Sequence, residues 1–165
     1  MIRIRPLQEE DIPDVQAIDA VSFSLPWPKE SFEMELRNPV SLCRVGEVCD
    51  PDGDWHIVGM MITWIIVDEA HIATIAVHPD YRQQGIARLL LASMLKTGIE
   101  LGVSMATLEV RSGNNKAQRL YESFRFEVVA KRLCYYSDNN EDALIMTLNG
   151  LGKEYLMWLE KDQVL

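Results

Sequence analysis

The segment Val77-His78-Pro79-Asp80-Tyr81-Arg82-Gln83-Gln84-Gly85-Ile86-Ala87 joins an apolar run, His71 to Val77, to a pattern typical of a helix. Because proline lacks an amide hydrogen and restricts the residue before it, the run is predicted to be a strand that ends at Val77. Apolar residues then recur at helical spacing, which predicts a helix from about Gly85 to Glu100. Free amides at a helix start, beside a glycine that lets a ligand approach closely, suit a pyrophosphate, although the glycine could simply begin a helix.

The rest of the chain alternates between strand-like and helix-like patterns, without a linker or a repeat. Turn-forming residues at 50–54 and 137–141 each separate two strand-like runs, which predicts two hairpins. The predicted order, β-α-α-β-β-β-α-β-α-β-β, is that of one mixed α/β domain. Strands are expected at residues 2–5, 42–48, 56–67, 71–77, 105–110, 126–133 and 142–148, and helices from Ile12, from Pro28 through Leu36, over 85–100, and from Asn114 or Asn115 to Phe124.

Composition narrows the class of protein. The 165 residues, 48% apolar and 25% charged, fit one folded domain. No apolar run reaches about 18 residues and the first residues lack the apolar stretch of a secretory signal, so we expect a cytoplasmic protein with no membrane partner. The net charge of -9 opposes binding to nucleic acid and favours a neutral or basic acceptor, unless the acidity serves only solubility.

The cysteines and histidines show no spacing typical of a metal site. Cys43, Cys49 and Cys134 are odd in number and unpaired in sequence, and the three histidines are scattered. The sequence therefore predicts neither a metal site nor a disulfide framework.

Two residues are candidates for acid–base chemistry. Glu109 interrupts an otherwise apolar strand, where an ionisable group costs stability unless it is paired, solvated or used. Tyr121 lies on the following helix, and a phenol with an ordinary pKa of about 10 can donate a proton to a thiolate. Each also has a structural interpretation, because Glu109 could form a surface ion pair and Tyr121 could belong to the core.

The loop motif, Arg82-x-x-Gly85-x-Ala87 after Val77-His78-Pro79-Asp80-Tyr81, resembles the carrier-binding motif of the GNAT superfamily of N-acetyltransferases, and the element order matches that fold over residues 1–148. The resemblance implies acetyl-CoA as cosubstrate and a mostly antiparallel sheet of six to seven strands, splayed between strands 4 and 5 and flanked by about four helices. It also implies that these residues hold acetyl-CoA: Ile75, Ala76, Val77, Arg82, Gln83, Gln84, Gly85, Ile86, Ala87, Arg88 and Asn114.

A second set of residues is similar to one branch of that superfamily. Leu108-Glu109-Val110-Arg111, then Asn114, then Leu120-Tyr121-Glu122-Ser123 resemble the ribosomal-protein-alanine N-acetyltransferases, which modify protein amino termini. The resemblance implies that Glu109 is the general base and Tyr121 the general acid. It further implies that the segment Phe23 to Pro28, with Trp27, is a substrate-side loop and that Tyr135 and Tyr136 lie near the acceptor.

The acceptor itself has alternatives. An α-amino group has a pKa of about 8 and lysine about 10.4, so near pH 7.4 deprotonation costs about 4 kcal/mol for lysine and below about 1 kcal/mol for the terminus. This favours a protein amino terminus. A small amine or a free amino acid would instead need a narrow pocket beside Tyr135 and Tyr136, and a noncatalytic acyl-CoA-binding module would need neither Glu109 nor Tyr121.

Three features depart from the family pattern. Arg125 stands where the family usually has glycine, Cys134 occupies a position that is often polar, and a tail extends from residue 150 to 165. In the tail, after two glycines, one helical stripe contains Tyr155, Trp158, Leu159 and Asp162. This pattern predicts an amphipathic helix that docks on its own domain or on a second copy. We therefore expect a domain over residues 1–149, a helical extension over 150–165, and a monomer or homodimer.

Overall fold

The computed structural model describes residues 1–162, which form a single seven-stranded sheet with helices on both faces. The strands lie in the order β1-β2-β3-β4-β5-β7-β6, and every neighbouring pair is antiparallel except β4 and β5. The predicted mixed α/β fold with a mostly antiparallel sheet is confirmed. The strands are β1 (Ile2–Pro6), β2 (Ser41–Cys49), β3 (Trp55–Ile66), β4 (Glu69–Val77), β5 (Met105–Arg111), β6 (Glu127–Arg132) and β7 (Ala143–Asn149).

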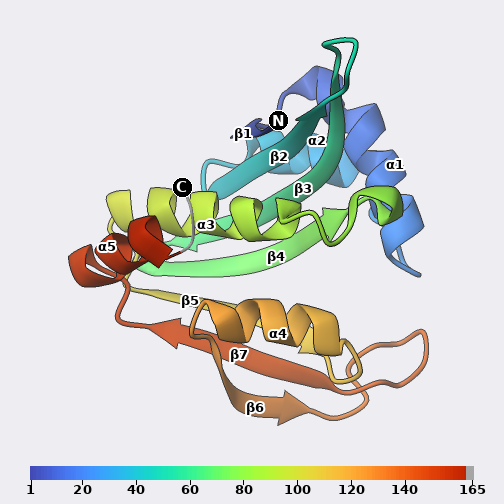
Figure 1. The fold of residues 1–165 in the computed structure, drawn as a ribbon. Helices are drawn as coiled ribbons and strands as arrows, with labels where there is room; N and C mark the ends of the chain where they lie inside the picture. Colours follow the sequence, from blue (N-terminus) through green and yellow to red (C-terminus); the bar gives the residue numbers. More distant parts are fainter. Residues whose placement is uncertain (163–165) are drawn as a thin grey trace.

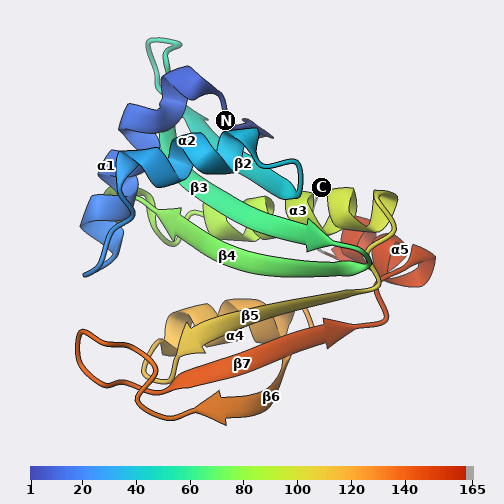
Figure 2. The same cartoon turned by 180° about the vertical axis from the view of Figure 1, so that it is seen from behind.

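Helices cover the two faces of the sheet unequally (Figure 1). The helices are α1 (Ile12–Ser22), α2 (Lys29–Arg37), α3 (Ile86–Glu100), α4 (Asn115–Ser123) and α5 (Lys153–Asp162), with 3-10 turns η1 (Glu9–Asp11) and η2 (Pro79–Tyr81). On one face α1 and α2 pack over β2 to β4, and on the other α3, α4 and α5 lie over the sheet. Seen from the α1 and α2 side, strands β5, β7 and β6 carry no helix (Figure 2).

The sheet splays between β4 and β5, as the family resemblance implies. Parallel pairing joins Glu69–Ile72 to Met105–Leu108 and stops there, although β4 stays paired with β3 up to Val77 and β5 stays paired with β7 up to Arg111. A bulge at Ala73 marks the point of separation on β4, and the two strands diverge beyond it (Figure 2). Backbone groups on the facing edges of residues 73–77 and 109–111 are therefore left without a strand partner.

Helix α3 begins in close contact with the sheet. Gly46 and Gly59 are directly paired across β2 and β3, and a Cβ at either position would lie 3.0 Å from Cγ2 of Ile86. Ile86 and Leu90 are buried, so the absence of two side chains in the sheet lets the first turn of α3 pack against it. This contact fixes the position of the Gly85 loop relative to the end of β4.

The tail forms the predicted helix and packs on its own chain. Tyr155 and Leu159 are buried, and the Tyr155 hydroxyl donates to the Phe124 carbonyl at 2.8 Å. The guanidinium of Arg125 lies 4.0 Å from the ring centroid of Trp158. Asp162, the last residue of the predicted stripe, is also the last residue of α5. Residues 163–165 of the predicted extension lie outside the described part of the chain. The division at residue 149 stays a prediction.

Arg125 adopts a conformation that ordinarily favours glycine. Its φ is +69°, and the Arg125 and Phe126 amides donate to the carbonyls of Glu122 and Tyr121 at 2.8 and 3.1 Å. This hydrogen-bond pattern is the Schellman motif that ends many helices. The departure from the family pattern therefore leaves the turn after α4 intact, at the cost of a left-handed non-glycine residue.

Candidate active site

Six consecutive amides are free at the start of α3. Within residues 1–162, the backbone N–H groups of residues 83–88 donate no hydrogen bond, whereas Arg82 and Leu89 on either side donate to Pro79 and Gly85 at 3.3 and 3.0 Å. Gln83 and Gly85 have φ of +63° and +84°, and left-handed residues in a loop are typical of backbone nests that bind anions. Free amides at a helix start, near the positive end of its dipole, fit a pyrophosphate.

The two arginines of this loop have different surroundings. Arg82 donates through Nε to the Val77 carbonyl at 3.0 Å, so it ties the loop to the end of β4. Arg88 lies on α3 and donates to the Ser123 hydroxyl at 3.1 Å, next to the end of α4. Each arginine thus has a structural contact in addition to its predicted role, Arg82 with the end of β4 and Arg88 with the end of α4.

The residues predicted to hold the pantetheine arm lie on the diverging part of the sheet. Ile75, Ala76 and Val77 form the end of β4, beyond the last pairing with β5. Asn114 precedes α4, and its side-chain oxygen accepts from the Ala117 amide at 3.1 Å. Of the two residues expected to begin this helix, Asn114 and Asn115, Asn114 is the N-cap.

Glu109 is the first residue of β5 beyond the pairing with β4. Its side chain is 19% exposed and has two cationic or ionisable neighbours. Oε2 lies 3.1 Å from Nε2 of His71, and Oε1 lies 3.8 Å from Nη1 of Arg132. Sequence patterns gave no reason to select His71 or Arg132, because their proximity to Glu109 depends on strand pairing.

Tyr121 lies on α4 and belongs to the core on the α3 side of the sheet. It is 5% exposed and its ring packs against Phe126, with the ring centroids 5.8 Å apart. Burial raises the pKa of its phenol far above the ordinary value, and Tyr136 adds a smaller effect in the same direction. The phenol is therefore protonated at neutral pH, as a proton donor must be.

The two segments predicted to be near the acceptor contact each other. Ser24, in the α1–α2 loop, donates to Asp138, in the β6–β7 loop. Arg111, at the end of β5, forms two hydrogen bonds with Asp138, of 3.1 and 2.8 Å, and its guanidinium lies 3.9 Å from the ring centroid of Tyr136. Tyr135 packs edge-on against Tyr136, with the ring centroids 5.2 Å apart. The β6–β7 loop is thus fixed beside the open face of β5, the face on the α1 and α2 side that carries no helix.

A buried carboxylate supports the α1–α2 loop. Asp19 is fully buried, and its Oδ2 accepts from the Trp27 amide at 2.6 Å. Its Oδ1 has no hydrogen-bond partner among the described residues, and burial raises the pKa of this carboxyl above its ordinary value despite the Trp27 hydrogen bond. Trp27 in turn packs against Phe32, with the ring centroids 5.7 Å apart. Sequence patterns did not reveal this support.

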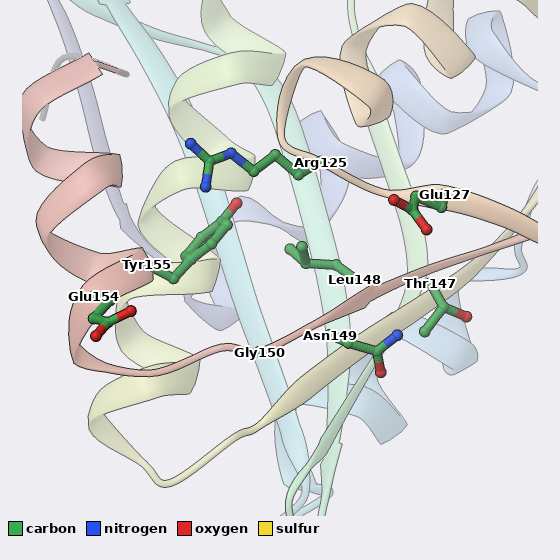
Figure 3. Close-up of a pocket in the computed structure, with 8 residues that line it drawn as sticks. All are labelled: Arg125, Glu127, Thr147, Leu148, Asn149, Gly150, Glu154 and Tyr155. Atoms are coloured by element: carbon green, nitrogen blue, oxygen red, sulfur yellow. The ribbon is translucent and has the colours of Figure 1, made fainter.

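A hollow of about 320 Å³ lies elsewhere, between the start of β6, the end of β7 and α5 (Figure 3). Its lining is mostly polar and includes Arg125, Thr147 and Tyr155. It lies at the opposite end of the sheet from the Gly85 loop, so it is separate from the predicted site. Over residues 1–162, no group of three His, Cys, Asp or Glu side chains is arranged to hold a metal, and no helix is long and apolar enough to cross a membrane.

Residues 12–126, more than half of the chain, match the model of the Acetyltransferase (GNAT) family. The chain belongs to this family. The GNAT resemblance is confirmed, as are the enzyme class and the cosubstrate: the protein is an acetyl-CoA-dependent N-acetyltransferase. The alternative of a noncatalytic acyl-CoA-binding module is set aside.

Individual GNAT proteins resemble the chain over nearly its whole length. A Bacillus subtilis (strain 168) protein provisionally named ribosomal protein bS18-alanine N-acetyltransferase is 40% identical, over 87% of this chain and 92% of its own. The crystal structure of the Escherichia coli ribosomal-protein-S18-alanine N-acetyltransferase has a TM-score of 0.81 at 32% identity, and covers 93% of this chain and 96% of its own. Arabidopsis thaliana NAA60 in complex with acetyl-CoA shares the fold, with a TM-score of 0.79 at 20% identity over 90% of this chain and 98% of its own.

Proposed function

We propose that this GNAT protein acetylates the N-terminal α-amino group of a protein, as its relatives of the ribosomal-protein-alanine type are named for doing. The observation that carries the proposal is the open face of β5 beyond Leu108, where Glu109 lies. The joined α1–α2 and β6–β7 loops border this face and contain Trp27, Tyr135 and Tyr136. An open face bordered by loops suits the end of a polypeptide better than the narrow pocket that a small amine needs.

In this proposal the free amides of residues 83–88 bind the pyrophosphate of acetyl-CoA, with Arg88 as a nearby cation. The unpaired edge of Ile75 to Val77 binds the pantetheine arm, helped by the side-chain nitrogen of Asn114. These contacts direct the thioester to the point where β4 and β5 separate, between Ala73 and Glu109.

Two side chains handle the protons. Glu109 acts as general base and takes one proton from the acceptor ammonium, so that the amine lone pair can attack the thioester carbonyl. As the C–N bond forms and the C–S bond breaks, Tyr121 donates its phenolic proton to the departing sulfur. Tyr121 then regains a proton from the nitrogen of the new amide. The products are the amide, the free thiol and one proton released to solvent.

The chemistry of the acceptor supports an amino terminus. A terminal amine costs below about 1 kcal/mol to deprotonate near pH 7.4, against about 4 kcal/mol for lysine, so a carboxylate base suffices for the terminal amine. The net charge of -9 also favours a neutral or basic acceptor. The cytoplasmic location and the choice between monomer and homodimer stay predictions.

The test is mass spectrometry of peptides after incubation with acetyl-CoA. Each peptide is used in two forms, one with a free terminus and no lysine, and one with a blocked terminus and an internal lysine. We expect acetylation only of the free terminus, with alanine first among the residues tested. Acetylation of small amines or of the internal lysine, but not of the terminus, would contradict the proposed acceptor.

A further inference from the structure

His71 lies on β4 beside the point where the sheet separates. It pairs in register with Trp64 of β3 and with Thr107 of β5. Because side chains two residues apart share a face of a strand, Thr107 and Glu109 point to the same side, and the imidazole reaches Glu109 diagonally. The distance of 3.1 Å between Nε2 of His71 and Oε2 of Glu109 is short enough for an ion pair.

The imidazole is held in this position from its other side. It stacks on the indole of Trp64, with the ring centroids 5.4 Å apart and the planes inclined by 18°. The Trp64 Nε1–H donates to Glu35 of α2 at 2.9 Å, which fixes the indole. The stack and this hydrogen bond therefore hold the imidazole in place against Glu109.

The His71 side chain is also in reach of solvent. It is 26% exposed, and none of the side-chain hydrogen bonds of residues 1–162 involves its Nδ1. A free imidazole has a pKa of about 6.5 and a free glutamate about 4.3, so imidazole binds a proton about a hundredfold more tightly. A carboxylate that removes a proton from an ammonium group would therefore hand it on readily to an imidazole in contact with it.

We propose that His71 and Glu109 form one acid–base pair, in which the proton that Glu109 takes from the acceptor amine passes to His71. The proton moves from the ammonium nitrogen to Glu109 and from Glu109 to Nε2 of His71, which leaves an imidazolium–carboxylate ion pair. The imidazolium then releases its Nδ1 proton to water, and exchange with solvent returns the remaining proton from Nε2 to Nδ1, so that Nε2 can accept again. The C–N and C–S bond changes and the role of Tyr121 are those already given.

This inference rests on the proposed role of Glu109 as the base. Charged and titratable groups around the pair lie on β5 itself and on three other elements, and they enter its pH response: Arg111 on β5, Glu35 on α2, Arg132 on β6 and Tyr136 in the β6–β7 loop. The closest after His71 is Arg132, 3.8 Å from Glu109. Arginine stays charged over the working range, so the imidazole is the partner of Glu109 that can exchange a proton.

The experiment measures kcat against pH at saturating peptide for wild type, His71→Gln and Glu109→Gln. Under the proposal, His71→Gln lowers kcat at pH 8 by about tenfold to a hundredfold and moves the acid limb of the profile to lower pH, because only a carboxylate then takes the proton. Imidazole added to His71→Ala restores part of the rate. The matched control is His56→Gln, which removes another histidine–carboxylate pair, 2.8 Å from Asp50, in the β2–β3 hairpin and leaves kcat and its pH profile unchanged.

The outcomes separate the two proposals. If His71→Gln keeps the wild-type kcat and pH profile, the acid–base pair is overturned. It is also overturned if kcat falls while the acid limb stays in place and imidazole restores no activity, because that result would indicate a purely structural contact. If Glu109→Gln also keeps the wild-type profile, the proposed base is wrong as well. The NMR signals of the His71 ring provide a readout without turnover: Glu109→Gln should move them at constant pH, and unchanged signals would contradict the pairing. Melting curves with and without acetyl-CoA identify variants that fail to fold.

Discussion

Replacement of Gly85 by valine tests the assignment of the acetyl-CoA loop. Gly85 has φ of +84°, and a Cβ built on it meets no atom within 4 Å, so the side chain would project into open space in the loop of free amides. Valine therefore strains the backbone and blocks the place proposed for the pyrophosphate, without a clash inside the protein. The strain is about 1–2 kcal/mol for a left-handed non-glycine residue, which lowers Tm by about 2–8 °C in a chain of this size.

The effect on binding should be much larger than the effect on folding. A hydrogen bond to a charged group contributes about 1.5–3 kcal/mol, so loss of two of the proposed amide contacts costs about 3–6 kcal/mol. This corresponds to an increase in Kd of about 10² to 10⁴ for acetyl-CoA, measured by isothermal titration calorimetry.

Gly53 provides a matched control. It has φ of +96°, and a Cβ there also meets nothing within 4 Å, but it lies in the β2–β3 hairpin. Gly53→Val should lower Tm by a similar amount and leave the Kd for acetyl-CoA unchanged. The proposed pyrophosphate site at Gly85 is refuted if Gly85→Val binds acetyl-CoA as tightly as wild type, or if Gly53→Val loses as much affinity as Gly85→Val.

Four further predictions follow from particular contacts. Tyr121→Phe should slow single-turnover acetyl transfer by about 10² to 10⁴ with acetyl-CoA affinity retained; a wild-type rate would exclude the phenol as the acid. Burial raises the pKa of Asp19 in the folded state. Protonation of Asp19 therefore stabilises the fold fully below the pKa of the unfolded state, and this stabilisation is lost as pH rises through the pKa of the folded state. Urea unfolding of Asp19→Asn at several pH values should therefore show a gain over wild type that grows as pH rises above about 4, and a pH-independent difference would contradict this. Val67, 90% exposed with φ of +57°, loses no packing when replaced, so Val67→Asn should raise Tm by about 2–4 °C, whereas a lower Tm would show that the turn is not strained. Gly59→Ala places a Cβ 3.0 Å from Ile86 and should destabilise the fold by about 1–3 kcal/mol in the same unfolding assay; wild-type stability would mean that α3 shifts freely.

The order of the elements and the position of the Gly85 loop, between β4 and α3, were predictable from sequence because both depend on local patterns. Pro79 ends β4 and apolar spacing defines α3, and neither needs a distant partner. Asn114 was predictable as a cap for the same reason, since its acceptor contact is with an amide three residues on. The splay of the sheet came only from the family resemblance, because no local pattern says where two strands stop pairing.

The environment of the proposed catalytic residues was not predictable in this way. Glu109 stood out as an ionisable residue in an apolar strand, but its neighbours His71 and Arg132 come from other strands. No sequence pattern distinguishes Asp19 from other helix residues, because only the path of the α1–α2 loop brings the Trp27 amide onto it. Such contacts depend on register and loop path, which a one-residue slip would change completely.

The sequence by itself therefore determined the strands, the helices and the loop of free amides, because backbone preferences and apolar periodicity act over a few residues. The tertiary structure alone decided that β4 and β5 part at Ile72 and Leu108, that His71 lies against Glu109, and that Ser24 joins Asp138 across the open face. The residues in these contacts lie far apart in the chain. Ile72 and Leu108 are 36 positions apart, and Ser24 and Asp138 are 114 positions apart. They form only because the packed sheet holds distant segments in a fixed register. The loss of conformational entropy on ordering these segments is offset by the free energy gained when the whole core is buried.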